Sequence, residues 1–176
     1  MAKNTDKFER IVRFFYKNPN KEIHVRGLAK SLDCSVGFIS QNISSLVNDG
    51  IVEEDRKGNM KTFTARSTSS EYRKKKRAWN IGEILVSDLP EYLEGELYPD
   101  AIILFGSYLE GTDSEDSDID LAIINGREKS LNLSSYEDKF ERDINLTQID
   151  SLNNSEKDFL NTLANGLVLK GYLEVI

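Results

Sequence analysis

Hydrophobic residues in the first third of the chain recur every three or four positions, which is the period of an amphipathic helix. The pattern predicts three helices, over residues 6–17, 25–32 and 36–49. Gly50 directly follows the third helix, where a residue without a side chain favours the left-handed turn that ends many helices. The chain therefore begins with a helical region that closes near residue 50.

A β-hairpin is predicted after the third helix, because two short strand-like segments flank a turn sequence. The segments are Ile51–Glu54 and Thr62–Arg66. The turn between them reads Arg56-Lys57-Gly58-Asn59, which makes the tip of the hairpin basic. The expected order of elements is therefore helix, helix, helix and hairpin.

The second half of the chain combines short apolar runs with amphipathic segments. Ala101–Phe105 is continuously apolar, which is typical of a buried strand. Two further strands and a last extended segment are predicted at Asp118–Ile124, Ile144–Ile149 and Val168–Val175. Helices are predicted at Asp88–Leu97 and Glu156–Leu163. This mixture indicates an α/β (α+β) fold class with a small mixed sheet.

The charged residues also divide the chain into a basic first half and an acidic second half. Residues 1–80 carry 17 Lys and Arg against 9 Asp and Glu, a net charge of +8. Residues 81–176 carry 6 against 21, a net charge of −15. A basic half suits a polyanion, and an acidic half repels one. We therefore predict two domains, residues 1–68 and 87–176, joined by a helical linker at residues 69–86.

The composition leads us to expect a cytoplasmic protein that does not associate with a membrane. The sequence has no apolar run of the ~18 residues that a membrane span requires. Its first residues lack the apolar stretch of a signal peptide. Cys34 is the only cysteine, so an intrachain disulfide is excluded.

The predicted elements of residues 5–66 resemble those of the winged-helix regulators of archaea and bacteria, in which the third helix enters the major groove of DNA. The resemblance implies contacts to double-stranded DNA from the outward face of this helix and from the hairpin. The residues concerned are Ser35, Ser40, Gln41, Asn42, Arg56 and Lys57. It also implies a homodimer on a palindromic site. The alternative is a domain that mediates protein contacts only.

Two carboxylates stand one residue apart at the start of a predicted strand. Asp118 and Asp120 occupy positions whose side chains share one face of a strand, with alpha carbons about 6.6 Å apart. Such a pair can hold Mg²⁺ or Mn²⁺, and Mg²⁺ completes its oxygen shell with substrate phosphates. Gly106 and Ser107 follow the preceding strand, where a bare backbone and a hydroxyl group suit a phosphate.

A longer motif around this pair resembles the signature of the DNA polymerase beta-like nucleotidyltransferase superfamily, in particular its minimal nucleotidyltransferase branch. The motif reads Gly106-Ser107-Tyr108-Leu109-Glu110-Gly111-Thr112 and then Ser117-Asp118-Ile119-Asp120-Leu121-Ala122-Ile123. The resemblance covers about residues 88–176 and implies transfer of a nucleoside monophosphate from a nucleoside triphosphate (NTP) to a hydroxyl acceptor. It implies that Gly106, Ser107 and Ser117 bind the nucleotide, and that Asp118 and Asp120 are catalytic and hold magnesium.

The third carboxylate of that signature is missing from its expected place. In the superfamily this carboxylate comes from the next core strand, and the matching position here is Asn145. An amide can lend an oxygen to a metal, but it carries no charge and cannot accept the proton of the acceptor hydroxyl. Asp143 is the alternative ligand, although it lies two residues earlier, about 6.6 Å along the strand.

Three functions are consistent with these motifs. The first is a magnesium-dependent nucleotidyltransferase, tethered by its winged helix to DNA or to a partner of a regulator, with an NTP as substrate and a protein as a possible acceptor. The second is a transcription regulator whose degenerate transferase domain binds only a nucleotide or a protein partner. The Asp118–Asp120 pair favours the first, whereas Asn145 and the unrelated DNA-binding half favour the second. The third is an antitoxin that modifies a partner toxin, as some minimal nucleotidyltransferases do.

Overall fold

The structure is a computed structural model that describes residues 2–150 and 156–173. The chain divides into two compact units, Met1–Lys76 and Arg77–Ile176. The boundary between them falls inside one continuous helix, α4 (Ser70–Leu85), so this helix contributes residues to both units.

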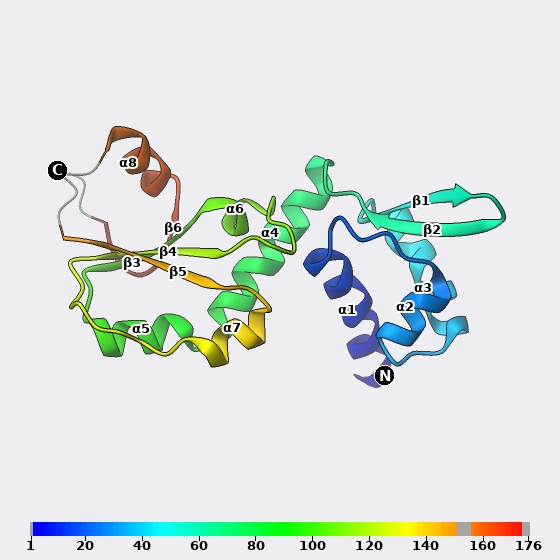
Figure 1. Cartoon of the computed structure of the whole chain (residues 1–176), viewed down its shortest axis with the longest axis horizontal. Helices are drawn as coiled ribbons and strands as arrows, with labels where there is room; N and C mark the ends of the chain where they lie inside the picture. The colour runs from blue at the N-terminus through cyan, green and yellow to red at the C-terminus, as the bar shows by residue number, and fades with distance from the viewer. Residues whose placement is uncertain (1, 151–155, 174–176) are drawn as a thin grey trace. The chain divides into compact units, whose positions relative to one another are not determined.

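The first unit contains helices followed by a two-stranded antiparallel hairpin (Figure 1). Its elements before α4 are α1 (Ala2–Lys17), α2 (Val25–Ser31), α3 (Val36–Asn48), β1 (Val52–Lys57) and β2 (Met60–Ala65). This is the order that the hydrophobic pattern predicted, although α1 begins earlier than expected. The inward residues of the three helices are fully buried, among them Ile11, Phe15, Leu28, Ile39 and Leu46.

Local signals set the two ends of α3. The Ser35 hydroxyl accepts a hydrogen bond from the Phe38 backbone N–H at 3.2 Å, which satisfies one of the free donors of the first turn. After the helix, Gly50 adopts a φ of +69°, a conformation that strains residues with a Cβ atom. Both ends were therefore readable from the sequence.

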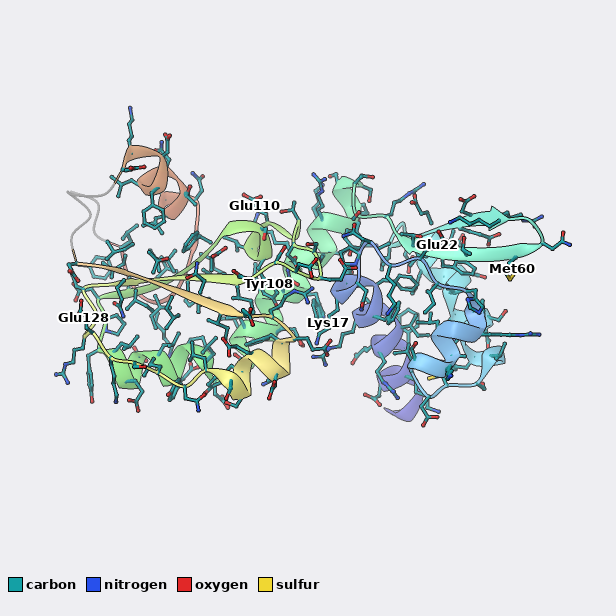
Figure 2. All side chains as sticks on the ribbon, viewed as in Figure 1. Lys17, Glu22, Met60, Tyr108, Glu110 and Glu128 are labelled. Carbon is teal, nitrogen blue, oxygen red and sulfur yellow. The ribbon has the colours of Figure 1, made fainter. Side chains whose placement is uncertain are left out.

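The hairpin differs from the prediction in its turn. Lys57 pairs with Met60, which leaves a turn of only Gly58 and Asn59. Arg56 and Lys57 therefore lie on β1 and not in the turn, and β1 continues past Glu54. The reason is that Gly58, with a φ of +64°, supplies the backbone freedom that a two-residue turn needs. Met60 is exposed beside this turn (Figure 2).

The first half of α4 is fastened to α1 through an aromatic pair. The Tyr72 hydroxyl donates a hydrogen bond of 2.9 Å to the Phe15 carbonyl, and its ring contacts that of Tyr16 at a centroid distance of 5.5 Å. Phe15 and Tyr16 are buried inside the unit, whereas Phe8 and Phe14 are half-buried. Of these aromatics, only the latter two keep exposed apolar surface on α1.

The second unit is built on a four-stranded mixed sheet with the order β5-β4-β3-β6. Strand β4 pairs in parallel with β5, and β3 is antiparallel to both β4 and β6. Its elements after α4 are α5 (Leu89–Leu97), β3 (Ala101–Phe105), α6 (Gly106–Glu110), β4 (Ile119–Ile124), α7 (Ser134–Phe140), β5 (Ile144–Ile149), α8 (Lys157–Ala164) and β6 (Leu167–Gly171). The predicted α+β character and the small mixed sheet are thus present.

Alternating residues of the central strands bury both faces of the sheet. Ile102, Leu104 and Leu121 face a core to which α4, α5, α6 and α7 contribute. Ile103 and Ala122 face a smaller core on the other side, where Leu163 of α8 packs (Figure 1). Because β3 and β4 are covered on both sides, their ends have fixed positions. The residues that directly follow β3 and those that directly precede β4 are therefore also fixed in position.

The second unit differs from the prediction at the start of β4 and in helix α7. Strand β4 begins at Ile119, so Asp118 directly precedes the strand. Helix α7 was not predicted at all. Strand β6 ends at Gly171, while the end of the predicted segment at Val175 lies outside the described residues. Among the residues that the structure describes, no helix has the length and apolar character needed to cross a membrane.

Candidate functional site

The backbone of Gly106 lies against the carboxylate of Asp120. Strand β3 ends at Phe105, which pairs with Asp120 of the neighbouring strand, so the first residue of α6 meets the start of β4. A Cβ atom at Gly106 would lie 2.5 Å from Asp120 Oδ2. Gly106 also has a φ of +75°. Only glycine meets both requirements, which explains the residue found here.

Asn145 stands beside the same carboxylate. Asp120 and Asn145 are register partners of the parallel β4–β5 pair. The Asn145 side-chain amide Nδ2 donates a hydrogen bond of 3.1 Å to Asp120 Oδ1. The structure thus brings Asn145 to the position beside Asp120 that the sequence assigned to a third ligand. In this arrangement its NH₂ group, and not its oxygen, faces the carboxylate.

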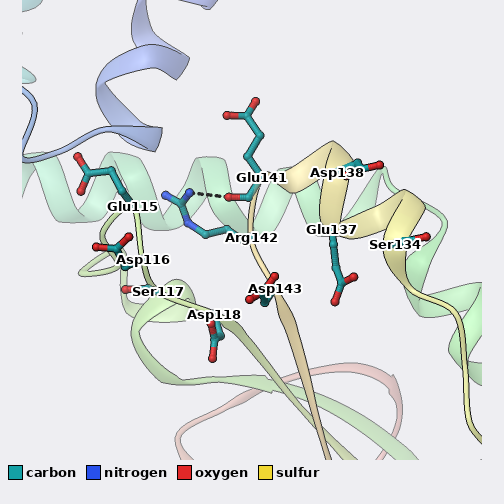
Figure 3. Close-up of a pocket in the computed structure, with 10 residues that line it drawn as sticks. All are labelled: Glu115, Asp116, Ser117, Asp118, Ser134, Glu137, Asp138, Glu141, Arg142 and Asp143. Atoms are coloured by element: carbon teal, nitrogen blue, oxygen red, sulfur yellow. Dashed lines mark hydrogen bonds between the residues drawn. The ribbon is translucent and has the colours of Figure 1, made fainter.

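Asp118 borders a cavity of about 570 Å³ next to this point (Figure 3). The cavity is strongly acidic, and Asp118 and Asp143 lie on its wall together with Ser117 and Glu137. The main chains of the two strands are joined here, because the Ile119 N–H donates to the Asp143 carbonyl at 2.8 Å. Asp143 therefore neighbours Asp118, whereas Asn145 neighbours Asp120.

The two serines of the motif differ in their surroundings. Ser107 is half-buried on α6, one residue after Gly106. Ser117 closes its own loop, because its hydroxyl accepts a hydrogen bond of 2.9 Å from the Ser114 backbone N–H. Ser107 therefore follows the Gly106–Asp120 contact by one residue, while Ser117 orders the segment that leads to Asp118.

A buried polar cluster in the same loop was not foreseen. Asp113 is 3% exposed, although it lies in a run of acidic residues that looks solvated in the sequence. Asn80 of α4 donates a hydrogen bond of 2.9 Å to its carboxylate, and the Arg142 guanidinium lies 3.7 Å from it. No spacing rule connects these residues, since Asn80 lies 33 positions before Asp113.

Acidic ligands for a metal are few at the Gly106–Asp120 contact. Within residues 2–150 and 156–173, no group of three or more His, Cys, Asp or Glu side chains is arranged to hold a metal ion. The pair Asp118 and Asp120 is accompanied by an amide at Asn145. Magnesium commonly uses one or two protein carboxylates together with substrate phosphates, so the donor set fits a metal that arrives with a nucleotide.

On the first unit, the side chains assigned to α3 are only partly available. Ser40 and Gln41 are exposed. The Ser35 hydroxyl caps the helix, and the Asn42 amide donates to the Phe38 carbonyl at 2.7 Å. Of these four side chains, Ser40 and Gln41 are therefore the two that are exposed and make no hydrogen bond to α3 in the part of the chain that the structure describes.

The two basic residues of the hairpin are also unequal. Arg56 is exposed on β1. Lys57 donates a hydrogen bond of 2.5 Å to the Glu22 carboxylate, and this hydrogen bond raises the pKa of the Lys57 amine above its ordinary value. The charge of Lys57 is thus partly offset within the unit, which leaves Arg56 as the stronger attraction for an anion.

The second unit combines a mixed sheet, a carboxylate pair at the head of β4 and a glycine–serine step after β3. Residues 87–171 match the family model described as Polymerase beta, Nucleotidyltransferase. The match lies entirely within the second unit. No curated protein and no solved structure matches the chain.

Proposed function

We propose that the second unit is an enzyme that transfers a nucleoside monophosphate from an NTP to a hydroxyl acceptor with the help of Mg²⁺ or Mn²⁺. The observation that carries the proposal is the contact of the Gly106 backbone with the Asp120 carboxylate, inside the matched region. A backbone without a side chain lets the triphosphate come close to the carboxylates that hold its metal.

The roles of the residues follow from their positions. Gly106 and Ser107 would hold the triphosphate, and Ser117 would keep the approach to Asp118 in shape. Asp118 and Asp120 would hold the metal, which when bound neutralises phosphate charge. The acceptor oxygen bonds to the α-phosphorus while pyrophosphate leaves. The hydroxyl proton passes to a carboxylate or to water, because the Asn145 amide cannot accept it.

Two carboxylates and a neutral amide carry less negative charge than three carboxylates. We therefore propose that the metal binds strongly only together with the nucleotide, whose phosphate oxygens complete its shell. Isothermal titration with Mn²⁺ alone, with ATP or GTP alone, and with Mn²⁺ together with either nucleotide measures this dependence. Radiolabelled NTPs with Mg²⁺, with and without host lysate, reveal any transferred label.

Single variants tie this binding to the site. Asp118→Asn and Asp120→Asn should each abolish metal-dependent nucleotide binding and transfer. Asp116→Asn is the matched control, since it removes an exposed carboxylate from the same loop and should leave binding within about twofold of wild type, as expected for a screened surface charge. Equal nucleotide binding by wild type and both site variants would place the site elsewhere.

A second function is favoured by one observation, the hydrogen bond from Asn145 to Asp120. With an amide in the third position, the unit could bind a metal–nucleotide complex without transferring the nucleotide, as a regulator that senses the nucleotide. Binding in the titration without any labelled product would support this function over the enzyme.

We further propose that the first unit is a winged-helix module that binds double-stranded DNA. Its support is the order of three helices and a hairpin in the described chain, the exposed Ser40 and Gln41 on α3, and Arg56 on the hairpin. Gln side chains can pair with adenine edges, whereas Arg on a wing meets phosphates. The tethered enzyme would then act near DNA.

A further inference from the structure

The loop between α6 and β4 is held near its start by a buried carboxylate. Asp113 Oδ1 accepts a hydrogen bond of 2.9 Å from Asn80 Nδ2, and Oδ2 lies 3.7 Å from Arg142 Nη2. The side chains of Asp113 and Arg142 are only 1% and 5% exposed. A buried ion pair seldom stabilises a fold more than apolar residues of the same size would. Stability alone is therefore a weak reason for its presence.

Asn80 of the same cluster also holds α6, one of the three segments that form the candidate site. Asn80 Nδ2 also donates a hydrogen bond of 2.7 Å to the Tyr108 carbonyl in α6, the helix that carries Ser107. Asn80 is completely buried, and its side-chain oxygen has no hydrogen-bond partner among the described residues. The two hydrogen bonds of Nδ2 therefore set the orientation of the amide, although this leaves the oxygen unbonded, which is unfavourable. The amide thereby couples the position of α6 to that of Asp113.

Arg142 connects the cluster to the third segment of the site. It directly precedes Asp143, whose carbonyl accepts the Ile119 N–H, and it borders the acidic cavity (Figure 3). Its Nη1 donates to the Glu141 carbonyl at 2.8 Å, which fixes the guanidinium on its own loop. The stretch from Asp113 to Ile119 is thus fastened at both ends, and Asp118 lies within it.

We propose that Asp113, with Asn80 and Arg142, is a positioning residue that sets the backbone of this stretch so that Asp118 meets the metal–nucleotide complex. The inference rests on the proposed function of the unit. A metal site tolerates displacements of only about 0.5 Å in its ligands, and a free loop of this length would exceed that. Asp113 itself touches neither metal nor nucleotide.

The test compares Asp113→Asn with Asp116→Asn, which removes a neighbouring but exposed carboxylate. Two readouts are needed, namely amide hydrogen exchange of residues 114–119 and Mn²⁺ binding in saturating ATP followed by electron paramagnetic resonance. We expect Asp113→Asn to exchange about tenfold faster in this stretch and to bind Mn²⁺ about tenfold more weakly, which is a change of about 1.4 kcal/mol. Asp116→Asn should match wild type in both.

Two further variants separate positioning from stability. The double variant Asp113→Asn with Arg142→Gln removes both charges, so that no guanidinium is left buried without its carboxylate. If the single variant Asp113→Asn does not fold, the double variant provides the test of the proposal. Leu93→Ala empties space in the core under α5 and lowers the thermal midpoint. It should nevertheless bind Mn²⁺ within twofold of wild type, because the loop keeps its anchors.

The outcomes are distinguishable. Wild-type protein that binds no Mn²⁺ with ATP overturns the proposed function, and the inference falls with it. Wild-type binding together with unchanged Mn²⁺ affinity in the folded Asp113 variants overturns the inference alone, whatever their exchange rates. Weaker Mn²⁺ binding in Leu93→Ala, in proportion to its lower stability, also overturns it.

Discussion

Gly106 lies against Asp120 in the candidate site, where a methyl group would meet Asp120 Oδ2 at 2.5 Å. Its φ of +75° adds backbone strain for any other residue. We expect Gly106→Ala to displace the Asp120 carboxylate and to weaken Mn²⁺ binding with ATP at least tenfold. The unfolding free energy should fall by about 1–3 kcal/mol, the usual cost of such a conformation. Titration and urea unfolding measure the two effects.

Gly95→Ala is the matched control for this substitution. Gly95 lies within α5, and a Cβ atom there would meet nothing within 4 Å. Because alanine favours a helix over glycine, this variant should be more stable by about 0.5–1 kcal/mol and should bind Mn²⁺ as wild type does. Wild-type Mn²⁺ affinity in Gly106→Ala would show that Asp120 is not a ligand.

Asn145→Asp replaces a hydrogen-bond donor with a second carboxylate beside Asp120. Without metal, the two negative charges repel each other, so the thermal midpoint should fall. With Mn²⁺ and ATP the added carboxylate should strengthen metal binding, and the midpoint should rise by more than it does in wild type. Thermal melts with and without both ligands test this. Equal ligand-induced shifts would favour Asp143 as the third ligand, which Asp143→Asn then examines.

At the scale of elements, α1 and α4 are joined by the hydrogen bond from Tyr72 to the Phe15 carbonyl. That carbonyl is one of the last four of α1, which have no partner within the helix. Tyr72→Phe should therefore destabilise the first unit by about 1–3 kcal/mol, the cost of an unpaired buried acceptor. Tyr172→Phe removes a hydroxyl from an exposed tyrosine and should change stability by less than about 0.5 kcal/mol. Urea unfolding followed by circular dichroism compares them.

Burial raises the pKa of the neighbouring Tyr16 from 10.0 to about 12. Between these values the unfolded chain loses its tyrosine proton while the folded chain keeps it, so the unfolded state is favoured as the pH rises. The first unit should thus lose stability between pH 10 and 12, and Tyr16→Phe should lose less over the same range. Parallel stability curves for wild type and Tyr16→Phe, measured by urea unfolding across this range, would contradict this.

The elements that were predictable have strong local signals. Ser35 and Gly50 mark the ends of α3, and the apolar run Ala101–Phe105 marks β3. Helix α7 was missed because only Phe140 within it is buried, which leaves no helical period of apolar residues. The hairpin turn was placed too early, because the basic residues before Gly58 read as turn residues although strand pairing extends through them. Tertiary contacts decide such cases.

The sequence predicts the arrangement of the candidate site only where adjacent strands place its residues. Adjacent strands bring Asp120 beside Asn145, and a glycine after β3 indicates a close approach. The burial of Asp113 was not predictable, because its partners Asn80 and Arg142 come from distant elements and its own neighbours are acidic and polar. Sequence spacing carries information along a strand or helix, but not across loops.

For the molecule as a whole, the proposed DNA binding should depend on salt, because basic residues of the first unit that contact phosphates would release counterions. Arg56→Ala should weaken binding to all sequences and reduce the slope of log affinity against log salt by about 1. Lys57→Ala should have a smaller effect, since Glu22 already binds this amine. Fluorescence anisotropy with genomic fragments at several salt concentrations measures the slopes.

Lys129→Ala provides the control, because it removes a positive charge from the second unit, where Lys129 is paired with Glu96. It should leave the salt slope unchanged. Binding that does not depend on salt, or an equal loss in Lys129→Ala and Arg56→Ala, would contradict a DNA site on the hairpin.

Helix α4 has a consequence for how the chain can be divided for experiment. Tyr72 in its first half serves the first unit, whereas Asn80 and Ile84 in its second half serve the other. A truncation at the unit boundary would start the second unit inside this helix and leave the first four N–H groups of the remaining half without helical partners. A separately expressed second unit should therefore begin at or before Ser70, so that its part of α4 lies away from the new end of the chain.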